Sequence, residues 1–146
     1  MEANLIILSK HTKKNTLDMG FKDSIKQSFR ELYDEVTDKD IKVTPNKQTF
    51  VIRYKLFSKK SNMLFLKLSC DASDSKSAEA ISYVISTFQK GPHRKDWNIV
   101  VTYDEASQYY CCKLMDGFGK FERKTRELVY TTLIKLFGVE WYSKSF

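Results

Sequence analysis

The last third of the chain carries one apolar stripe at helical spacing, and no other feature of the sequence restricts the fold as strongly. Between Asp104 and Gly138, apolar residues recur mostly every three or four positions, over about eight helical turns. Asp104 can cap the start of such a helix, and Gly138 suits its end. The stripe consists of Ala106, Tyr109 or Tyr110, Leu114, Phe118, Phe121, Thr125, Leu128, Leu133 and Leu136.

Inside this stripe, the run Gly117–Phe121 has the alternating glycine and aromatic residues of an RNA-recognition strand motif. The helical period on both sides of it favours a helix instead. The strand in which such domains stack their bases corresponds to "MLFLKLS" at Met63–Ser69, and it offers mainly aliphatic side chains. We therefore expect Gly117 and Gly119 to permit close helix packing or a local bend.

The preceding residues alternate between strand and helix patterns. Strands are expected at 5–8, 48–57, 63–69 and 97–102, and amphipathic helices at 21–37 and 78–88. The segment "DKDIKVTPNKQ" is expected to be a turn, because Pro45 and Asn46 block regular structure. The strand 48–57 should bury Phe50, Ile52, Tyr54 and Leu56 on one face.

This order of elements predicts an α+β fold of the ferredoxin-like βαββαβ type, with an antiparallel sheet and two helices on one face. Without the strand at 5–8, the same elements would give a smaller αββαβ unit. A long C-terminal helix follows. We expect residues 1–103 to form the sheet domain and residues 104–146 to form the helix and an aromatic tail, packed with the sheet domain as one unit.

The charge balance is basic, with 25 Lys and Arg against 18 Asp and Glu, and a net charge of +7. Such an excess is compatible with RNA or DNA binding, and it also keeps a protein soluble. Most of the basic clusters lie in expected loops, where solvation alone explains them. The candidate nucleic-acid-binding residues are Lys13, Lys14, Lys59, Lys60, Arg94, Lys95, Arg123 and Lys124.

The sequence contains no complete catalytic motif. Three cysteines without C-x-x-C spacing predict reduced, mostly buried thiols. There is no metal-ligand spacing and no phosphate-binding glycine loop, so we expect no cofactor. The apolar runs are too short to cross a bilayer, and the N-terminus lacks the features of a secretory signal. A cytoplasmic protein that does not bind membranes is the expectation.

The C-terminal stretch resembles a recurrent segment of bacterial abortive-infection and toxin proteins of the HEPN superfamily. The matching residues are Phe121, Glu122, Arg126, Val129, Gly138 and Trp141. The resemblance implies a defence-related RNA-cleaving toxin with an all-helical catalytic domain behind an α+β domain. Such nucleases place a His about four to six residues after an Arg, and neither His11 nor His93 fits that pattern.

The expected function is therefore that of a non-catalytic recognition or regulatory module of an antiviral-defence or toxin-type system. It would act through contacts of the C-terminal helix with a protein partner or a second copy, and nucleic-acid binding is the alternative. Glu122 and Arg126 are four residues apart, which also suits a simple ion pair. The candidate partner-binding residues are Phe118, Phe121, Glu122, Arg126, Val129, Trp141 and Tyr142.

Overall fold

The computed structural model describes residues 1–10, 18–60 and 62–139. It is an α+β structure with a six-stranded antiparallel sheet. In chain order the elements are β1 (Glu2–Ser9), α1 (Asp18–Leu32), β2 (Glu35–Val36), β3 (Asp40–Val43), η1 (Pro45–Lys47), β4 (Phe50–Lys60), β5 (Met63–Ser69), α2 (Asp74–Lys90), η2 (Pro92–Lys95), β6 (Trp97–Asp104) and α3 (Glu105–Phe137).

The sheet order β2-β3-β4-β5-β1-β6 contains the ferredoxin-like arrangement. The four strands β4-β5-β1-β6, with α1 and α2 in the two crossovers, follow the βαββαβ topology expected from the sequence. Strand β1 is central and pairs antiparallel with both β5 and β6. The smaller αββαβ alternative is therefore wrong, and the α+β class is confirmed.

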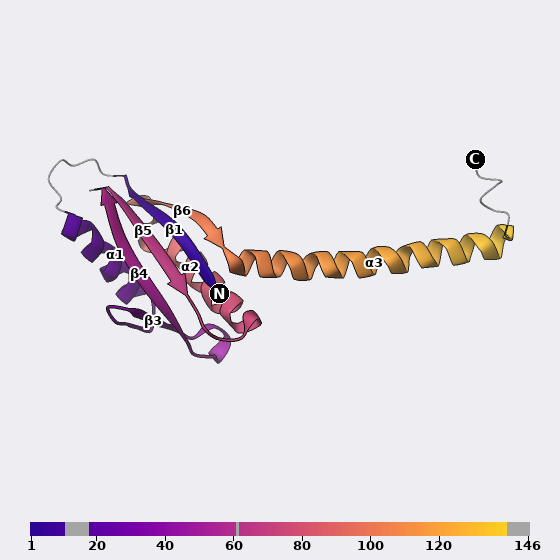
Figure 1. Ribbon diagram of the computed structural model, residues 1–146, viewed down its shortest axis with the longest axis horizontal. Helices are drawn as coiled ribbons and strands as arrows, with labels where there is room; N and C mark the ends of the chain where they lie inside the picture. Colours follow the sequence, from indigo (N-terminus) through magenta and orange to yellow (C-terminus); the bar gives the residue numbers. More distant parts are fainter. Residues whose placement is uncertain (11–17, 61, 140–146) are drawn as a thin grey trace. The chain divides into compact units, whose positions relative to one another are not determined.

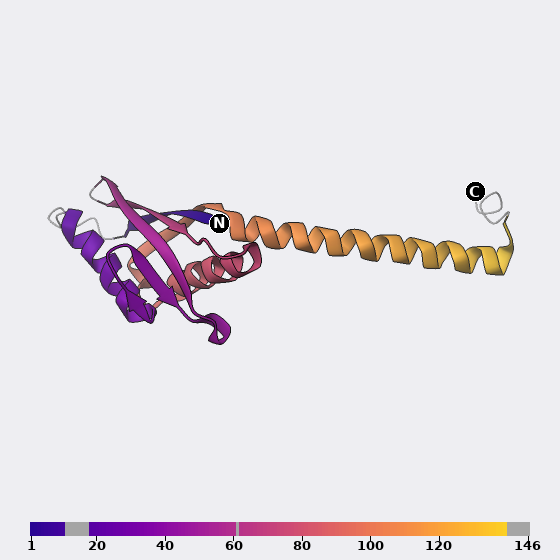
Figure 2. The same cartoon turned by 60° about the horizontal axis from the view of Figure 1, so that its bottom comes forward.

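Period-two alternation in the strands explains which face of the sheet is covered. In β1, Ala3, Leu5 and Ile7 are buried, and in β5 Leu64, Leu66 and Leu68 are buried. These side chains share one core with residues of α1 and α2. The two helices lie on the same face of the sheet (Figures 1 and 2). The expected helix residues Ile81 and Val84 belong to the same core. The alternate residues of each strand form the opposite face.

The helix expected at 21–37 is shorter than predicted, because α1 ends at Leu32. Tyr33 turns into the core, where its hydroxyl donates a hydrogen bond to the Val84 carbonyl oxygen at 2.9 Å. Burial raises the pKa of this hydroxyl far above its ordinary value. Val36 pairs with Ile41 in strand β2 instead of continuing the helix. Tertiary packing here overrides the local helical period.

The segment expected to be only a turn contains strand β3. Ile41 and Val43 are buried, and their strand pairs antiparallel with β4. The Pro45–Lys47 part is irregular as expected, and Asn46 has a positive φ of 50°. Helix α2 also ends as expected, before Gly91. A side chain at Gly91 would meet Leu32 Cδ1 at 3.2 Å and two carbonyl oxygens at 3.3 Å.

The long C-terminal helix is confirmed as α3. The Asp104 carboxylate accepts hydrogen bonds from the backbone N–H of Ala106 at 3.0 Å and of Ser107 at 3.2 Å, so it caps the helix as predicted. Gly138, with φ of 79°, follows its last turn and donates its N–H to the Ile134 carbonyl oxygen at 2.8 Å. Phe118 and Phe121 are helical, so Gly117–Phe121 is not a strand motif.

The chain divides into two compact units, with the boundary after Tyr109. The first turn of α3 belongs to the first unit, where Ala106 is fully buried and Tyr109 packs against the core. The second unit begins at Tyr110 and contains the rest of α3. The boundary thus lies inside the helix, whereas the sequence pattern places it at residue 104.

Candidate functional site

The first turn of α3 is anchored to the sheet by polar contacts within the first unit. The Glu105 carboxylate accepts hydrogen bonds from the Tyr103 hydroxyl at 2.8 Å and from the Glu2 backbone N–H at 2.6 Å. The bond from Tyr103, followed by that from Glu2, holds the pKa of Glu105 below its ordinary value. The carboxylate therefore stays charged at neutral pH, and its contribution to stability is lost as the pH falls through this lowered pKa.

Beyond Tyr109, α3 exposes a continuous apolar face. At 3.6 residues per turn, its members lie within about 100° of one another around the helix axis. Phe118 is 60% exposed, Phe121 69% and Leu128 68%. We call the following set the α3 apolar face: Tyr110, Leu114, Phe118, Phe121, Leu128, Val129 and Leu136.

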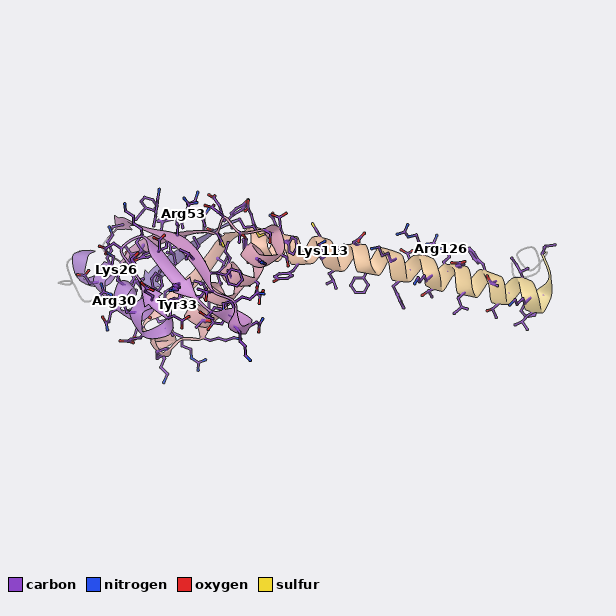
Figure 3. The ribbon with its side chains drawn as sticks, turned by 90° about the horizontal axis from the view of Figure 1, so that it is seen from below. Lys26, Arg30, Tyr33, Arg53, Lys113 and Arg126 are labelled. Atoms are coloured by element: carbon purple, nitrogen blue, oxygen red, sulfur yellow. The ribbon has the colours of Figure 1, made fainter. Side chains whose placement is uncertain are left out.

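The rest of the helix surface carries charged residues together with the exposed apolar residues Met115, Tyr130, Ile134 and Phe137. Lys113 and Arg126 project from the helix in Figure 3. Lys120 forms an ion pair with Asp116 at 3.0 Å. The ion pair expected between Glu122 and Arg126 is present, at 2.5 Å. Because both side chains are more than half exposed, this pair stabilises the helix by only about 0.2–0.5 kcal/mol.

The structure brings most of the predicted partner-binding residues together. Phe118, Phe121, Glu122 and Arg126 line one shallow hollow on α3, together with Met115, Gly119 and Thr125. Val129 lies on the same face, further along the helix. Trp141 and Tyr142 lie outside the described residues.

Gly117 and Gly119 have open surroundings. Apart from the adjacent residues and the helix's own backbone, no described atom lies within 4 Å of the position that a side-chain carbon would take at either glycine. Neither glycine is needed for packing within the described part of the chain.

The predicted burial of the cysteines is correct for one of the three. Cys70 is buried, but Cys111 and Cys112 are exposed on α3, and all three are free thiols. The physical reason is that the second unit is a single helix, which has no interior in which to bury a side chain. The helical spacing of apolar residues, from which burial was predicted, belongs here to an exposed surface of α3.

The predicted nucleic-acid-binding residues fall into three groups. Lys13 and Lys14 lie outside the described residues. Lys59 and Lys60 end strand β4, with side chains beyond what the structure describes, and Arg94 and Lys95 are exposed in η2. Arg123 and Lys124 are exposed on α3, in the other unit. The described members of this set thus belong to two separate units of the chain.

Sequence reasoning missed the open face of the sheet. The strand Met63–Ser69 looked mainly aliphatic, but its one aromatic residue, Phe65, is directly opposite Phe57 of β4. Phe57 is 52% exposed. The period-two pattern places both rings on the face away from α1 and α2, and this could have been found by pairing the two strands in register.

No protein-family model matches the chain, and comparisons with curated proteins and with solved structures give no significant match. Among the helices that the structure describes, none is long and apolar enough to span a membrane.

Proposed function

We propose that this chain is a non-catalytic recognition module that associates through the α3 apolar face, and that the partner bound there is a second copy of the chain. The observation that supports the proposal is the size and continuity of this face. Seven large apolar side chains, all at least 46% exposed, follow one side of the helix. Apolar patches of more than a few hundred Å² on a folded protein mark interaction surfaces.

The area of the face suits a stable dimer. Large apolar side chains have surfaces of roughly 150–250 Å² each, so seven of them at the observed exposure offer on the order of 800 Å². A standard protein interface buries about 800 Å² on each partner. One such helix can therefore supply its half of an interface.

Four members of the face, together with Thr125 and Thr132 on the same side of α3, have a spacing that suits pairing with an identical helix. The residues Leu114, Phe118, Phe121, Thr125, Leu128 and Thr132 are separated by four, three, four, three and four positions. This is the spacing of a coiled coil, in which each core side chain inserts between four side chains of the facing helix. A second copy carries the same spacing over the same length.

We also propose an antiviral-defence or toxin-type system as the setting. Its support is the resemblance of residues 103–141 to the HEPN-superfamily segment, including Phe121, Glu122 and Arg126. In this setting Glu122 and Arg126 orient the helix at the interface, and we assign no nuclease activity to these residues.

The test is the mass of the full chain in solution, measured by sedimentation velocity over a wide concentration series. The chain has a mass of 17.1 kDa. We expect a concentration-dependent shift to twice this value, because association depends on an exposed surface that is identical in both copies. A mass of one chain at every concentration would contradict the proposal.

A further inference from the structure

The open face of the sheet carries a row of apolar side chains that crosses four strands. Phe57 of β4 is opposite Phe65 of β5, which is opposite Ile6 of β1, which is opposite Val100 of β6. Phe57 is 52% and Val100 48% exposed, and Phe65 and Ile6 are half-buried. We call these four residues the apolar row. The buried core lies on the other face of the sheet, so packing of the core does not explain the aromatic pair Phe57 and Phe65.

Basic residues flank the apolar row on one side. Lys55 is directly opposite Lys67, two residues along their strands from Phe57 and Phe65. Two residues of a strand span about 7 Å, so these lysines lie beside the rings. Lys67 forms an ion pair with Glu2 at 2.8 Å, but both side chains are more than 40% exposed. Such an exposed ion pair is weak, so a phosphate can take the place of the Glu2 carboxylate beside Lys67.

Arg53 lies two residues before Lys55 in β4, on the same face, and so extends the basic surface that Lys55 and Lys67 form. Its side chain is 60% exposed, and its guanidinium pairs with the exposed Asp71 carboxylate. In Figure 3, Arg53 marks this face of the sheet, and Lys26 and Arg30 mark α1 on the other side.

The fold also brings basic residues from two separate segments of the chain to the other side of the apolar row. The Ser9 N–H donates to the Asn62 carbonyl oxygen and the Lys10 N–H to the Asp96 carbonyl oxygen, both at 3.0 Å. The Lys10 Nζ donates to the Arg94 carbonyl oxygen at 3.3 Å. These bonds join the end of β1 to the β4–β5 turn and to η2. We call the resulting group the basic end: Lys10, Arg94 and Lys95.

We propose that this face of the sheet binds single-stranded nucleic acid, with bases stacked on Phe57 and Phe65 and phosphates along Lys55, Lys67 and the basic end. The proposal does not depend on the function proposed for α3, which belongs to the other unit. Aromatic rings between basic groups favour a single strand, because its bases are free to stack while its phosphates remain exposed. In a duplex the base faces are covered, and an anionic lipid surface or an acidic peptide offers no base to stack.

The test is fluorescence anisotropy of the full chain with labelled oligouridine and oligodeoxythymidine of about 12 nucleotides, a length within the range that such surfaces bind. A duplex of equal length and anionic phospholipid vesicles are the comparison ligands. We expect binding of a single strand that is at least about tenfold tighter than of the duplex and that weakens steeply with salt. The affinities for oligouridine and oligodeoxythymidine, compared with each other, show whether the face prefers RNA or DNA.

The variants Phe57→Ala and Lys55→Glu assign this binding to the face. Loss of one stacking ring should weaken binding at least about fivefold with little change in its salt dependence. Lys55→Glu should weaken binding and reduce the slope of log K against log salt by about 1. Both side chains are exposed, so both variants should fold, which thermal unfolding checks.

Two matched controls should bind as the parent chain does. Lys76→Glu makes the same charge change on α2, where the side chain is exposed in the helix layer, and Phe137→Ala removes an exposed ring from α3 outside the α3 apolar face. Four results would each overturn the proposal: no binding of either single strand at low salt, equal binding of the duplex, a preference for the vesicles, or full binding by Phe57→Ala.

Discussion

The double variant Phe121→Glu, Leu128→Glu should remain a monomer at concentrations at which the parent chain is a dimer. Both residues lie at the centre of the α3 apolar face and are among its most exposed members. Truncated central interface residues cost about 2 kcal/mol or more each, and a buried unpaired carboxylate costs further. We expect the dissociation constant to rise by about 10³-fold. Sedimentation velocity measures it.

The control for this variant is Tyr130→Glu. Tyr130 is 48% exposed on the same helix, and at 100° per residue it lies on the side opposite the apolar face. Glutamate is a good helix former, so all of these variants should keep their helical circular dichroism. Dimerisation by the double variant at the parental concentration would show that the contact lies elsewhere.

Phe29→Ala should destabilise the first unit by about 3–5 kcal/mol, a large part of the 5–15 kcal/mol that holds a domain folded. Phe29 is fully buried at the centre of an aromatic cluster. Its ring centroid lies 5.0 Å from that of Phe88, 5.4 Å from Tyr54 and 5.8 Å from Tyr33. Removal of the ring leaves a cavity between α1, α2 and the sheet. Urea unfolding followed by circular dichroism measures the loss.

The matched control for this cavity is Phe57→Ala, the same change at a half-exposed position on the open face. It should cost less than about 1 kcal/mol, because the lost side chain is already largely hydrated. Similar losses at Phe29 and Phe57 would mean that the aromatic cluster is not the centre of the core.

The sheet and helices were predictable where one face of an element is buried. The alternation of Phe50, Ile52 and Tyr54 and the helical spacing of Ile81, Val84 and Ile85 each repeat often enough to identify the element. Strand β3 was not predicted, because it has only four residues and its two buried side chains, Ile41 and Val43, lie among turn-forming neighbours. Such a short strand is fixed by its partner β4, which local sequence does not reveal.

The candidate surfaces were predictable to different degrees. The α3 apolar face follows from spacing within one helix, so sequence alone indicated Phe118, Phe121 and Val129. The apolar row on the sheet depends on register between strands that are distant in the chain, so Phe57 and Phe65 could be recognised only after pairing. Periodicity also cannot tell a buried stripe from an exposed one, which is why Cys111 and Cys112 were expected inside.

The central claim, that the α3 apolar face binds a second copy, is tested most directly by backbone hydrogen exchange along α3 over a concentration series. A single helix without tertiary packing is only marginally stable in water, so amides beyond Tyr109 should exchange fast in the monomer. We expect protection of residues 114–136 to rise with protein concentration, while amides of β1 and β5 stay equally protected throughout. Exchange in α3 that is independent of concentration would contradict the claim.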